Sequence, residues 1–216
     1  MSLTVVRDKV LACKSCGLRE TCRAPVPGAA DVLVGGARYR VYPTTNTPPR
    51  IVLIGEAPGE REDDDGQPFV GASGQVLTSW LVRAGNPDVY ITNTVKCRPP
   101  SNRQPTVDEK AACRPHLDRE LEAIKPRVIV CFGRHAAMSM LRLFNKSTGM
   151  KRLVEMSTLP YDEAGQWMQV AARMTRAKVL VAYHPSYYLQ SGRRPEVATA
   201  CVDVLKRAIE LAEEPA

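Results

Sequence analysis

The sequence predicts an α/β fold, a three-layer α/β/α sandwich around a four-stranded parallel sheet. The first observation is that four short apolar runs, each of strand length, recur along the chain. The second is that segments with a helical pattern separate these runs, and strands that alternate with helices favour a parallel sheet. The third is that the runs are apolar throughout, as expected for strands buried on both faces. Helices are therefore expected on both sides of the sheet.

The predicted elements follow one another in a regular order. Residues 4–12 are expected to form a short helix before a cysteine-containing loop, and residues 23–49 are rich in proline and glycine. Within this loop segment, residues 32–34 and 39–42 are expected to pair as a hairpin across two glycines. Strands are predicted over residues 50–55, 89–92, 127–132 and 178–183. Helices are predicted over residues 74–84, 106–124, 134–144 and 195–213. Residues 145–177 contain turn signals and fit neither pattern.

Size, charge and hydrophobicity limit the kind of protein. The 216 residues, 44% of them hydrophobic, are enough for a single domain over residues 1–216 with its own core. The formal net charge of +7 favours an anionic partner without identifying it. No apolar run approaches the roughly 18 residues of a membrane span, and the first residues do not resemble a signal peptide. We therefore expect a cytoplasmic protein without membrane contact, and we expect a monomer.

Four of the seven cysteines have the spacing of a metal site. In a chain expected to be intracellular, cysteines indicate metal or redox chemistry before disulfides. Cys13 and Cys16 form a CxxC motif, and Cys97 and Cys113 form a second pair. Four thiolates complete either a tetrahedral zinc site or a cubane iron–sulfur cluster.

The other three cysteines have different surroundings. Cys22 follows the CxxC motif closely and is an alternative ligand. Cys131 lies in an apolar strand and Cys201 among the small apolar residues of a helix. Both are expected to be buried packing thiols.

The most informative segment follows the first predicted strand. Residues 55–71 combine glycines, carboxylates and one aromatic ring. They lack the lysine and the serine or threonine of a P-loop, and they lack the glycine triplet of a dinucleotide site. Such a segment suits a flat, neutral heterocycle better than a phosphate. Because parallel α/β sheets bind ligands beyond the carboxyl ends of their strands, this segment is expected to meet residues 93–105, 133–135 and 184–194.

Three motifs and the cysteine spacing resemble those of a known family. The motifs are GEAPGEREDDDGQPFVGASG (55–74), TNTVKCRPPSNRQP (92–105) and HPSYYLQ (184–190). Together they resemble the family 4 uracil-DNA glycosylases over most of the chain. The resemblance implies an enzyme that flips uracil out of single- or double-stranded DNA and hydrolyses its N-glycosidic bond. The product would be an abasic site, an intermediate of base excision repair.

The resemblance also implies a cofactor. It implies that Cys13, Cys16, Cys97 and Cys113 hold a [4Fe–4S] cluster that ties down the amino-terminal segment, with a structural zinc as the alternative. Four cysteines fill the coordination of the cluster, so we expect no catalytic role for the metal.

Four residues are implied to recognise the base. His184 ends the last strand and is implied to donate a hydrogen bond to the uracil O2 as negative charge develops there. Asn93 carries a donor and an acceptor that match uracil and reject cytosine. Phe69 offers a stacking face, and Glu62 is implied to fill the space beside the uracil C5. Gly55 is included in the same binding site.

The attacking water is expected to be positioned beside the first motif. Glu56 and Ala57 lie where related glycosylases place their water-handling residues, and Ala57 replaces the catalytic aspartate of some of those families. We therefore infer a dissociative mechanism led by stabilisation of the leaving group. His116 and His135 are expected to be structural, with His135 near the DNA.

Two loops are expected to hold DNA. Their basic, hydroxyl and apolar residues would contact phosphates and fill the gap left by the flipped base, with Leu189 or a tyrosine as the wedge. The expected DNA contacts are Arg98, Pro99, Ser101, Arg103, Ser186, Tyr187, Leu189 and Arg193.

Three departures from the family pattern leave alternatives open. Residues 23–49 and 145–177 are atypical inserts, and Tyr188 and Gln190 replace the leucine and arginine expected in the last motif. The alternatives are a glycosylase for another modified or deaminated base, and a non-catalytic iron–sulfur protein that binds DNA. A zinc-stabilised hydrolase of small nucleotides would share the fold, but the basic loops argue against it.

Overall fold

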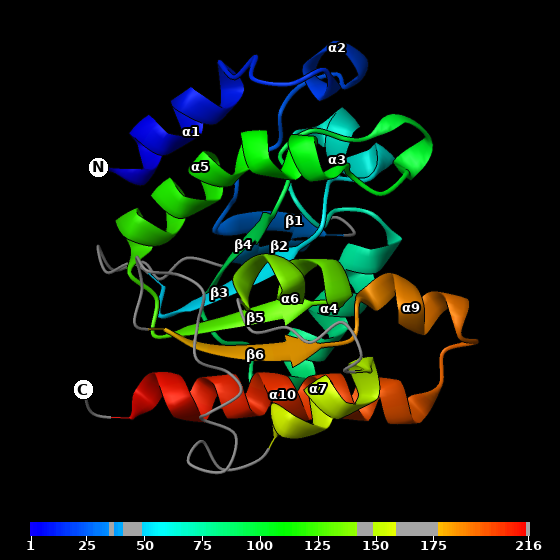
Figure 1. Cartoon of the computed structure of the whole chain (residues 1–216). Coiled ribbons are helices and arrows are strands. Elements are labelled where there is room, and N and C mark those ends of the chain that lie inside the picture. The colour runs from blue at the N-terminus through cyan, green and yellow to red at the C-terminus, as the bar shows by residue number, and fades with distance from the viewer. Residues whose placement is uncertain (35–36, 41–48, 142–148, 159–176, 215–216) are drawn as a thin grey trace.

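The computed structural model describes residues 1–34, 37–40, 49–141, 149–158 and 177–214. Its centre is a four-stranded parallel sheet with the strand order β4-β3-β5-β6 (Figure 1). The strands are β3 (Ile51–Gly55), β4 (Val89–Asn93), β5 (Val128–Phe132) and β6 (Lys178–Ala182). All but the first residue of β6 are buried, which explains the uninterrupted apolar runs. The predicted fold class and its four strands are confirmed.

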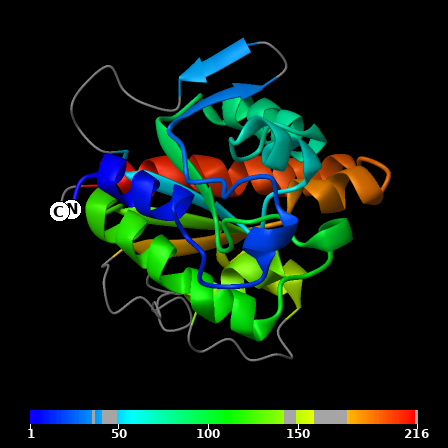
Figure 2. The same ribbon diagram turned by 90° about the horizontal axis from the view of Figure 1, so that it is seen from above.

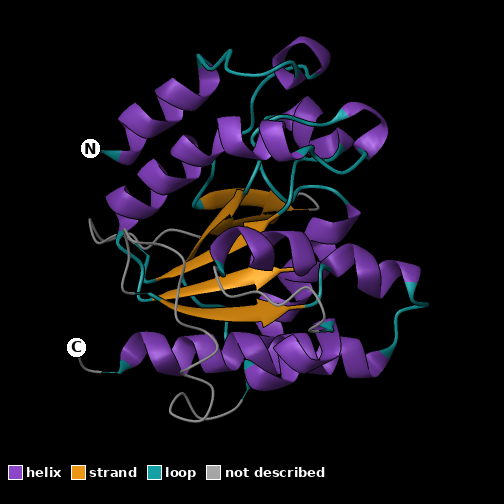
Figure 3. Cartoon of the chain, viewed as in Figure 1, coloured by secondary structure: helices purple, strands orange, loops and turns teal. Residues whose placement is uncertain are grey.

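Helices cover both faces of the sheet, as Figure 3 shows. One face packs against α4 (Ala72–Ala84) and α10 (Pro195–Glu213), and the other against α5 (Val107–Ile124) and α6 (Arg134–Met140). Alternate residues of one strand divide between these layers, so that Leu53 contributes to one core and Val52 to the other. The four helices predicted between and after the strands are confirmed, although α6 ends at Met140 and residues 142–148 lie outside the described part.

The amino-terminal segment packs along one edge of this sandwich. Helix α1 (Leu3–Leu11) lies beside α5, as Figure 2 shows, and a single-turn helix α2 (Leu18–Thr21) follows. The chain then runs antiparallel to β4, where Ala29 and Ile91 exchange two backbone hydrogen bonds of 2.9 and 2.8 Å. Residues 23–49 were expected to be a loop, but their first part covers the edge of the sheet.

The predicted hairpin is confirmed in this segment. Strand β1 (Asp31–Val34) pairs antiparallel with β2 (Ala37–Arg40), and Val34 lies opposite Ala37. The expected second strand extended to residue 42, and residues 41–48 lie outside the described part.

Several short helices were not predicted. They are α3 (Glu60–Asp65), the 3₁₀ turn η1 (Pro100–Asn102), α7 (Met150–Met156) and α9 (Pro185–Gln190). The acidic stretch expected to be loop is helix α3, because acidic side chains in a first turn complement the helix dipole. Helix α9 begins with a proline, which suits the first helical position. Helix α7 lies within the segment 145–177, whose residues 159–176 are outside the described part.

Among the helices of the described segments, none has the length and apolar character needed to cross a bilayer.

Candidate active site

A pocket of about 670 Å³ opens beyond the carboxyl ends of the strands. Its lining comes from residues 56–59 after β3, Asn93 at the end of β4, residues 132–135 after β5 and residues from 184 to 190 after β6. A volume of this size is typical of small-ligand sites. His184, Phe69 and Asn93 all line this one pocket, so the predicted meeting of these side chains is confirmed.

His184 is held in one tautomer by the start of α9. The residue is the N-cap of that helix, and its Nδ1 accepts the backbone N–H of Ser186 at 3.1 Å. The Ser186 hydroxyl lies 2.7 Å from the same nitrogen. Because Nδ1 acts as an acceptor, the hydrogen of a neutral ring is on Nε2. Burial lowers the pKa of His184 from 6.5 to about 4, so the ring is neutral at physiological pH.

Close backbone approach brings Phe69 and Asn93 together. The Phe69 ring centroid lies 6.0 Å from that of His184, and its backbone has a φ of 55°, a strained value for a phenylalanine. A Cβ on Gly55 would lie 2.4 Å from the Asn93 Oδ1 and 2.6 Å from the Phe69 ring. A Cβ on Gly74 would overlap the Phe69 carbonyl. Gly55, which was expected in the base-binding site, lies against these two side chains and is not part of the pocket lining.

A buried ionic network fixes the backbone of Asn93. The Lys96 Nζ donates to the Asn93 carbonyl at 2.8 Å and to the Glu120 carboxylate at 2.7 Å. Thr92 donates to the same carboxylate at 2.9 Å, and the Gly28 N–H reaches its other oxygen at 3.1 Å. Lys96 and Glu120 are each only 1% exposed. In the sequence, the only signal of this network is a lysine within an otherwise uncharged stretch.

Glu62 closes the loop around α3. Its two carboxylate oxygens accept the backbone N–H groups of Gly59 at 3.1 Å and Gly71 at 2.8 Å. The side chain is buried and lines the pocket. Because both oxygens are engaged by the backbone, Glu62 forms a fixed part of the wall.

Glu56 and Ala57 line the pocket beside the end of β3. The Glu56 carbonyl accepts the Thr94 hydroxyl at 2.6 Å, which fixes the backbone where water handling was expected. The Glu56 Oε1 is buried and has no hydrogen-bond partner among the described residues. The Lys110 Nζ and the His135 Nδ1 each lie 3.8 Å from that oxygen. Both distances are too long for hydrogen bonds.

Only half of the residues expected to contact DNA line the pocket. Pro99, Arg103, Ser186 and Tyr187 line the pocket, whereas Arg98, Ser101, Leu189 and Arg193 lie outside its lining. Arg103 forms two hydrogen bonds of 2.9 and 2.6 Å with Glu109, and this pairing lowers the pKa of that carboxyl to about 2. Arg98 lies 3.4 Å from Glu60. Tyr187 is 45% exposed, whereas Leu189 is half-buried.

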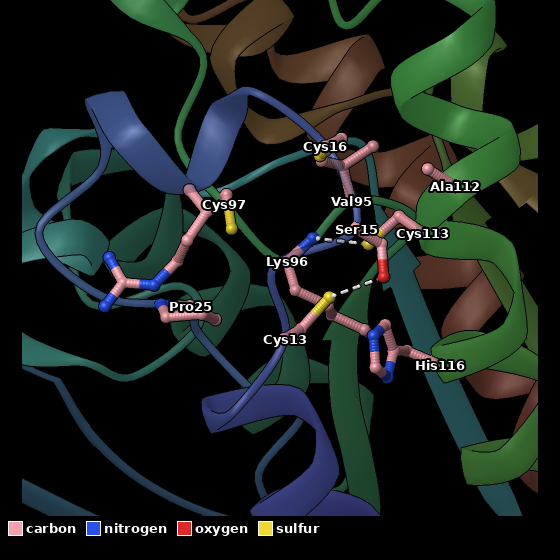
Figure 4. A pocket seen from close by; sticks show the side chains of 11 residues that line it. Cys13, Ser15, Cys16, Pro25, Val95, Lys96, Cys97, Ala112, Cys113 and His116 are labelled. Atoms are coloured by element: carbon pink, nitrogen blue, oxygen red, sulfur yellow. Dashed lines mark hydrogen bonds between the residues drawn. The ribbon is translucent and has the colours of Figure 1, made fainter.

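A second, smaller cavity gathers the four cysteines of the predicted metal site. Cys13, Cys16, Cys97 and Cys113 line it, together with His116, around a free space of about 10 Å³ (Figure 4). They come from the loop after α1, the loop after β4 and helix α5. Within the described ranges, no group of three or more His, Cys, Asp and Glu side chains is arranged to hold a single metal ion.

The surroundings of this cavity are polar. The Lys96 N–H donates to the Cys113 Sγ at 3.2 Å. The Nδ1 of His116 is buried and unpaired with respect to the rest of the described chain. Burial and the neighbouring thiol of Cys22 raise the pKa of Cys97. Cys22 therefore lies close to Cys97, but it does not line the cavity.

The remaining two cysteines belong to the hydrophobic core. Cys131 and Cys201 are fully buried, as predicted for packing thiols. Burial raises the pKa of both thiols, to about 12 for Cys201.

The fold and the site define a class of protein. A parallel α/β sheet carries, at its carboxyl edge, one pocket with a neutral imidazole, a carboxamide and an aromatic ring, a set suited to a planar heterocyclic base. Comparison with known proteins identifies the family. The family model "Uracil DNA glycosylase superfamily" matches residues 42–206, and the chain belongs to this superfamily.

Several curated relatives resemble the chain over most of its length. A "Type-4 uracil-DNA glycosylase" of Archaeoglobus fulgidus is 39% identical over 190 residues, which cover 87% of this chain and 83% of that protein. A protein of the same name from Thermotoga maritima is 35% identical over 208 residues, covering 95% and 92%. A "Type-5 uracil-DNA glycosylase" of Pyrobaculum aerophilum is 31% identical over 176 residues, covering 74% and 70%. The resemblance inferred from the motifs is confirmed.

Proposed function

We propose that this protein excises uracil from DNA by hydrolysing the N-glycosidic bond, which leaves an abasic site. The observation that carries the proposal is the single pocket in which His184, Asn93 and Phe69 meet. A protein that binds DNA without chemistry has no need for a half-buried imidazole held in one tautomer. Relatives named as uracil-DNA glycosylases, which match most of the chain, support the same activity.

The leaving group is the centre of the proposed mechanism. As the bond between the sugar C1′ and the uracil N1 breaks, its electron pair goes to the base and the uracil becomes an anion. The His184 Nε2–H would donate a hydrogen bond to the developing charge on O2. A neutral ring is suited to this role, because it stabilises the anion without giving up a proton.

Asn93 would read the edge of the base. The side-chain nitrogen Nδ2 would donate to the uracil O4, and the side-chain oxygen Oδ1 would accept the N3–H. Cytosine presents the opposite polarity at these two positions, so it would leave buried polar groups unpaired. The Lys96 contact and the absence of a side chain on Gly55 hold Asn93 in its position. Glu62 would form the wall beside C5.

Water attack would take place beside Glu56. The water oxygen bonds to C1′ of the oxocarbenium-like sugar, and its proton passes to the Glu56 carboxylate. Ala57 offers no side-chain base, so the contribution of general-base catalysis would be smaller than that of leaving-group stabilisation.

We propose that the four cysteines of the smaller cavity hold a [4Fe–4S] cluster. The thiol donors suit it, and the buried, unpaired His116 Nδ1 indicates a missing polar partner there. The alternative, a structural zinc, would use the same four thiolates.

The cluster would supply structural cross-linking. With all four positions filled by cysteines, it would join the loop after α1 to the loop after β4 and to α5. Anaerobic purification, visible absorbance and analysis of iron, sulfide and zinc distinguish a cluster from a zinc site. Zinc without sulfide would contradict the cluster.

The activity is tested by single-turnover release of uracil from labelled single- and double-stranded oligonucleotides. The wild-type protein should release uracil, and His184→Ala should be slower by roughly 10²–10³-fold, as for loss of an oxyanion donor. Val82→Ala, which changes an exposed side chain on α4, is the matched control. Intact strands after long incubation with excess wild-type protein would refute the proposal.

A second candidate substrate follows from Gln190. This side chain lines the pocket and offers a donor and an acceptor at the position where the family pattern has an arginine. The same assay with hypoxanthine and xanthine in place of uracil tests whether the protein excises another deaminated base.

A further inference from the structure

Three polar side chains from three different elements line one part of the pocket. Glu56 follows β3, Gln104 lies in the loop before α5, and His135 belongs to the first turn of α6. The Gln104 Nε2 lies 2.8 Å from the His135 Nε2. On the other side of the ring, the His135 Nδ1 lies 3.8 Å from the Glu56 Oε1. The motifs that identify the family do not include His135.

The contact with Gln104 determines the tautomer of His135. An amide nitrogen can only donate hydrogen bonds, so the His135 Nε2 must be the acceptor in this contact. A neutral imidazole that accepts through Nε2 carries its hydrogen on Nδ1. That hydrogen faces the carboxylate of Glu56. Gln104 therefore orients a donor toward the one buried oxygen of Glu56 that has no hydrogen-bond partner in the described segments.

We propose that His135 is a positioning residue that orients the Glu56 carboxylate toward the attacking water, and this inference rests on the proposed function. The 3.8 Å separation closes to a hydrogen bond by a small rotation of either side chain, and catalytic hydrogen bonds commonly tighten only when substrate binds. His135 keeps its proton throughout. The proton of the water passes to Glu56 and from there to solvent.

Lys110 acts on the same oxygen in a different way. Its Nζ is also 3.8 Å from the Glu56 Oε1, but an ammonium on a flexible stem provides charge without a fixed direction. The backbone of His135 is fixed in α6 and its Nε2 is fixed by Gln104, so its Nδ1–H restricts the carboxylate to one orientation. A fixed orientation matters because a misplaced general base loses most of its effect.

The tautomer can be measured without any enzymatic activity. The protein has only three histidines, so ¹⁵N-labelled histidine gives three resolvable rings. We expect the ring of His135 to be protonated on Nδ1, whereas an unconstrained imidazole favours Nε2–H. In Gln104→Glu, a carboxylate faces Nε2, and the Nε2 resonance should move to its protonated range. An Nε2–H tautomer in the wild-type protein, or an unchanged spectrum in Gln104→Glu, would overturn the proposal.

Kinetics test the role of the contact. His135→Phe keeps an aromatic ring without the donor, and it should slow single-turnover uracil release roughly tenfold, the loss expected for a hydrogen bond to a charged group. The affinity for the oligonucleotide should stay within about twofold, a change too small to come from a lost contact with DNA. His135→Gln should recover part of the rate, and Met138→Ala, an exposed change on the same helix, should be unaffected.

A double-variant cycle separates this role from general damage to the fold. If His135 acts through Glu56, His135→Phe should have little further effect in a Glu56→Gln background. A full, additive loss in that background would overturn the proposal. If no variant and no wild-type protein releases uracil, the proposed function fails, while the ¹⁵N spectra still decide the tautomer.

Discussion

The neutral state of His184 makes the stability of the protein depend on pH. Its pKa falls from 6.5 to about 4 on folding because burial disfavours the imidazolium. Between these values the unfolded chain binds more protons than the folded one, so stability is complete above pH 6.5 and is lost as the pH falls toward 4. At about 1.4 kcal/mol per pKa unit, the loss reaches about 2 kcal/mol near pH 5 and about 3 kcal/mol near pH 4.

The assay compares the wild-type protein with His184→Asn. Asparagine can still accept the backbone N–H of Ser186 as an N-cap, so the start of α9 is kept while the titrating ring is removed. Unfolding by urea, under anaerobic conditions at about pH 7.5 and about pH 5, gives the free energy of unfolding for each protein. The wild-type protein should lose about 2 kcal/mol more than the variant between the two pH values.

Other groups cancel in this comparison. The pKa of His116 is also lowered, by burial and by the nearby Lys96, but His116 is present in both proteins. Equal losses in the two proteins would contradict a lowered pKa of His184, and so would a histidine spectrum in which this ring titrates at its ordinary pKa. In that case His184 would be a cation in mild acid, and a neutral donor to the uracil O2 would be untenable.

Three further predictions follow from contacts in and behind the pocket. Lys96→Met leaves Glu120 buried without its cation and should lower the free energy of unfolding by roughly 3–5 kcal/mol, whereas Lys96→Met combined with Glu120→Leu should recover much of it in urea denaturation. Gly55→Ala should slow uracil release with an unchanged circular dichroism spectrum, because the new methyl displaces Asn93; an unchanged rate would contradict this crowding. Glu62→Gln should cost about 1–3 kcal/mol, since one of its two backbone N–H partners then faces an amide donor, and equal thermal stability would argue against the double contact.

The sheet could be predicted because its strands leave an unambiguous pattern. Runs such as residues 51–54 and 128–132 are apolar without alternation, rich in β-branched residues and too short for most helices, which favours strands buried on both faces. The prediction that His184 and Asn93 lie in one pocket followed from the parallel sheet. Each lies just beyond or at the end of a parallel strand, and such ends share one edge of the sheet.

The rest depended on contacts between distant residues. Glu62 was expected beside the uracil C5, but nothing in the sequence indicated that it accepts a backbone N–H nine residues away, at Gly71. Arg103 was expected to contact phosphate, yet it is paired with Glu109, an interaction that only the folded loop creates. Lys96 is fully buried although lysine is rarely buried unless paired, and its partner lies 24 residues further along the chain.

His135 shows the limit of motif-based reasoning most clearly. His135 lies two residues after the N-cap Gly133, in the first turn of a helix, a common structural position. Its contacts with Gln104 and Glu56 arise because α6 and two loops meet at the same edge of the sheet.

The path of the amino-terminal segment has a consequence for biosynthesis. Cys13 and Cys16 leave the ribosome first, but Cys113, which lines the same cavity, emerges only about 100 residues later. A similar delay separates Gly28 from Glu120, whose carboxylate accepts the Gly28 N–H. At typical elongation rates this interval is on the order of 5–20 s. During that time the two early thiols have no docking surface on the nascent chain. Assembly of the proposed cluster would therefore follow completion of α5, and an early thiol would be the vulnerable group if translation stalled in between.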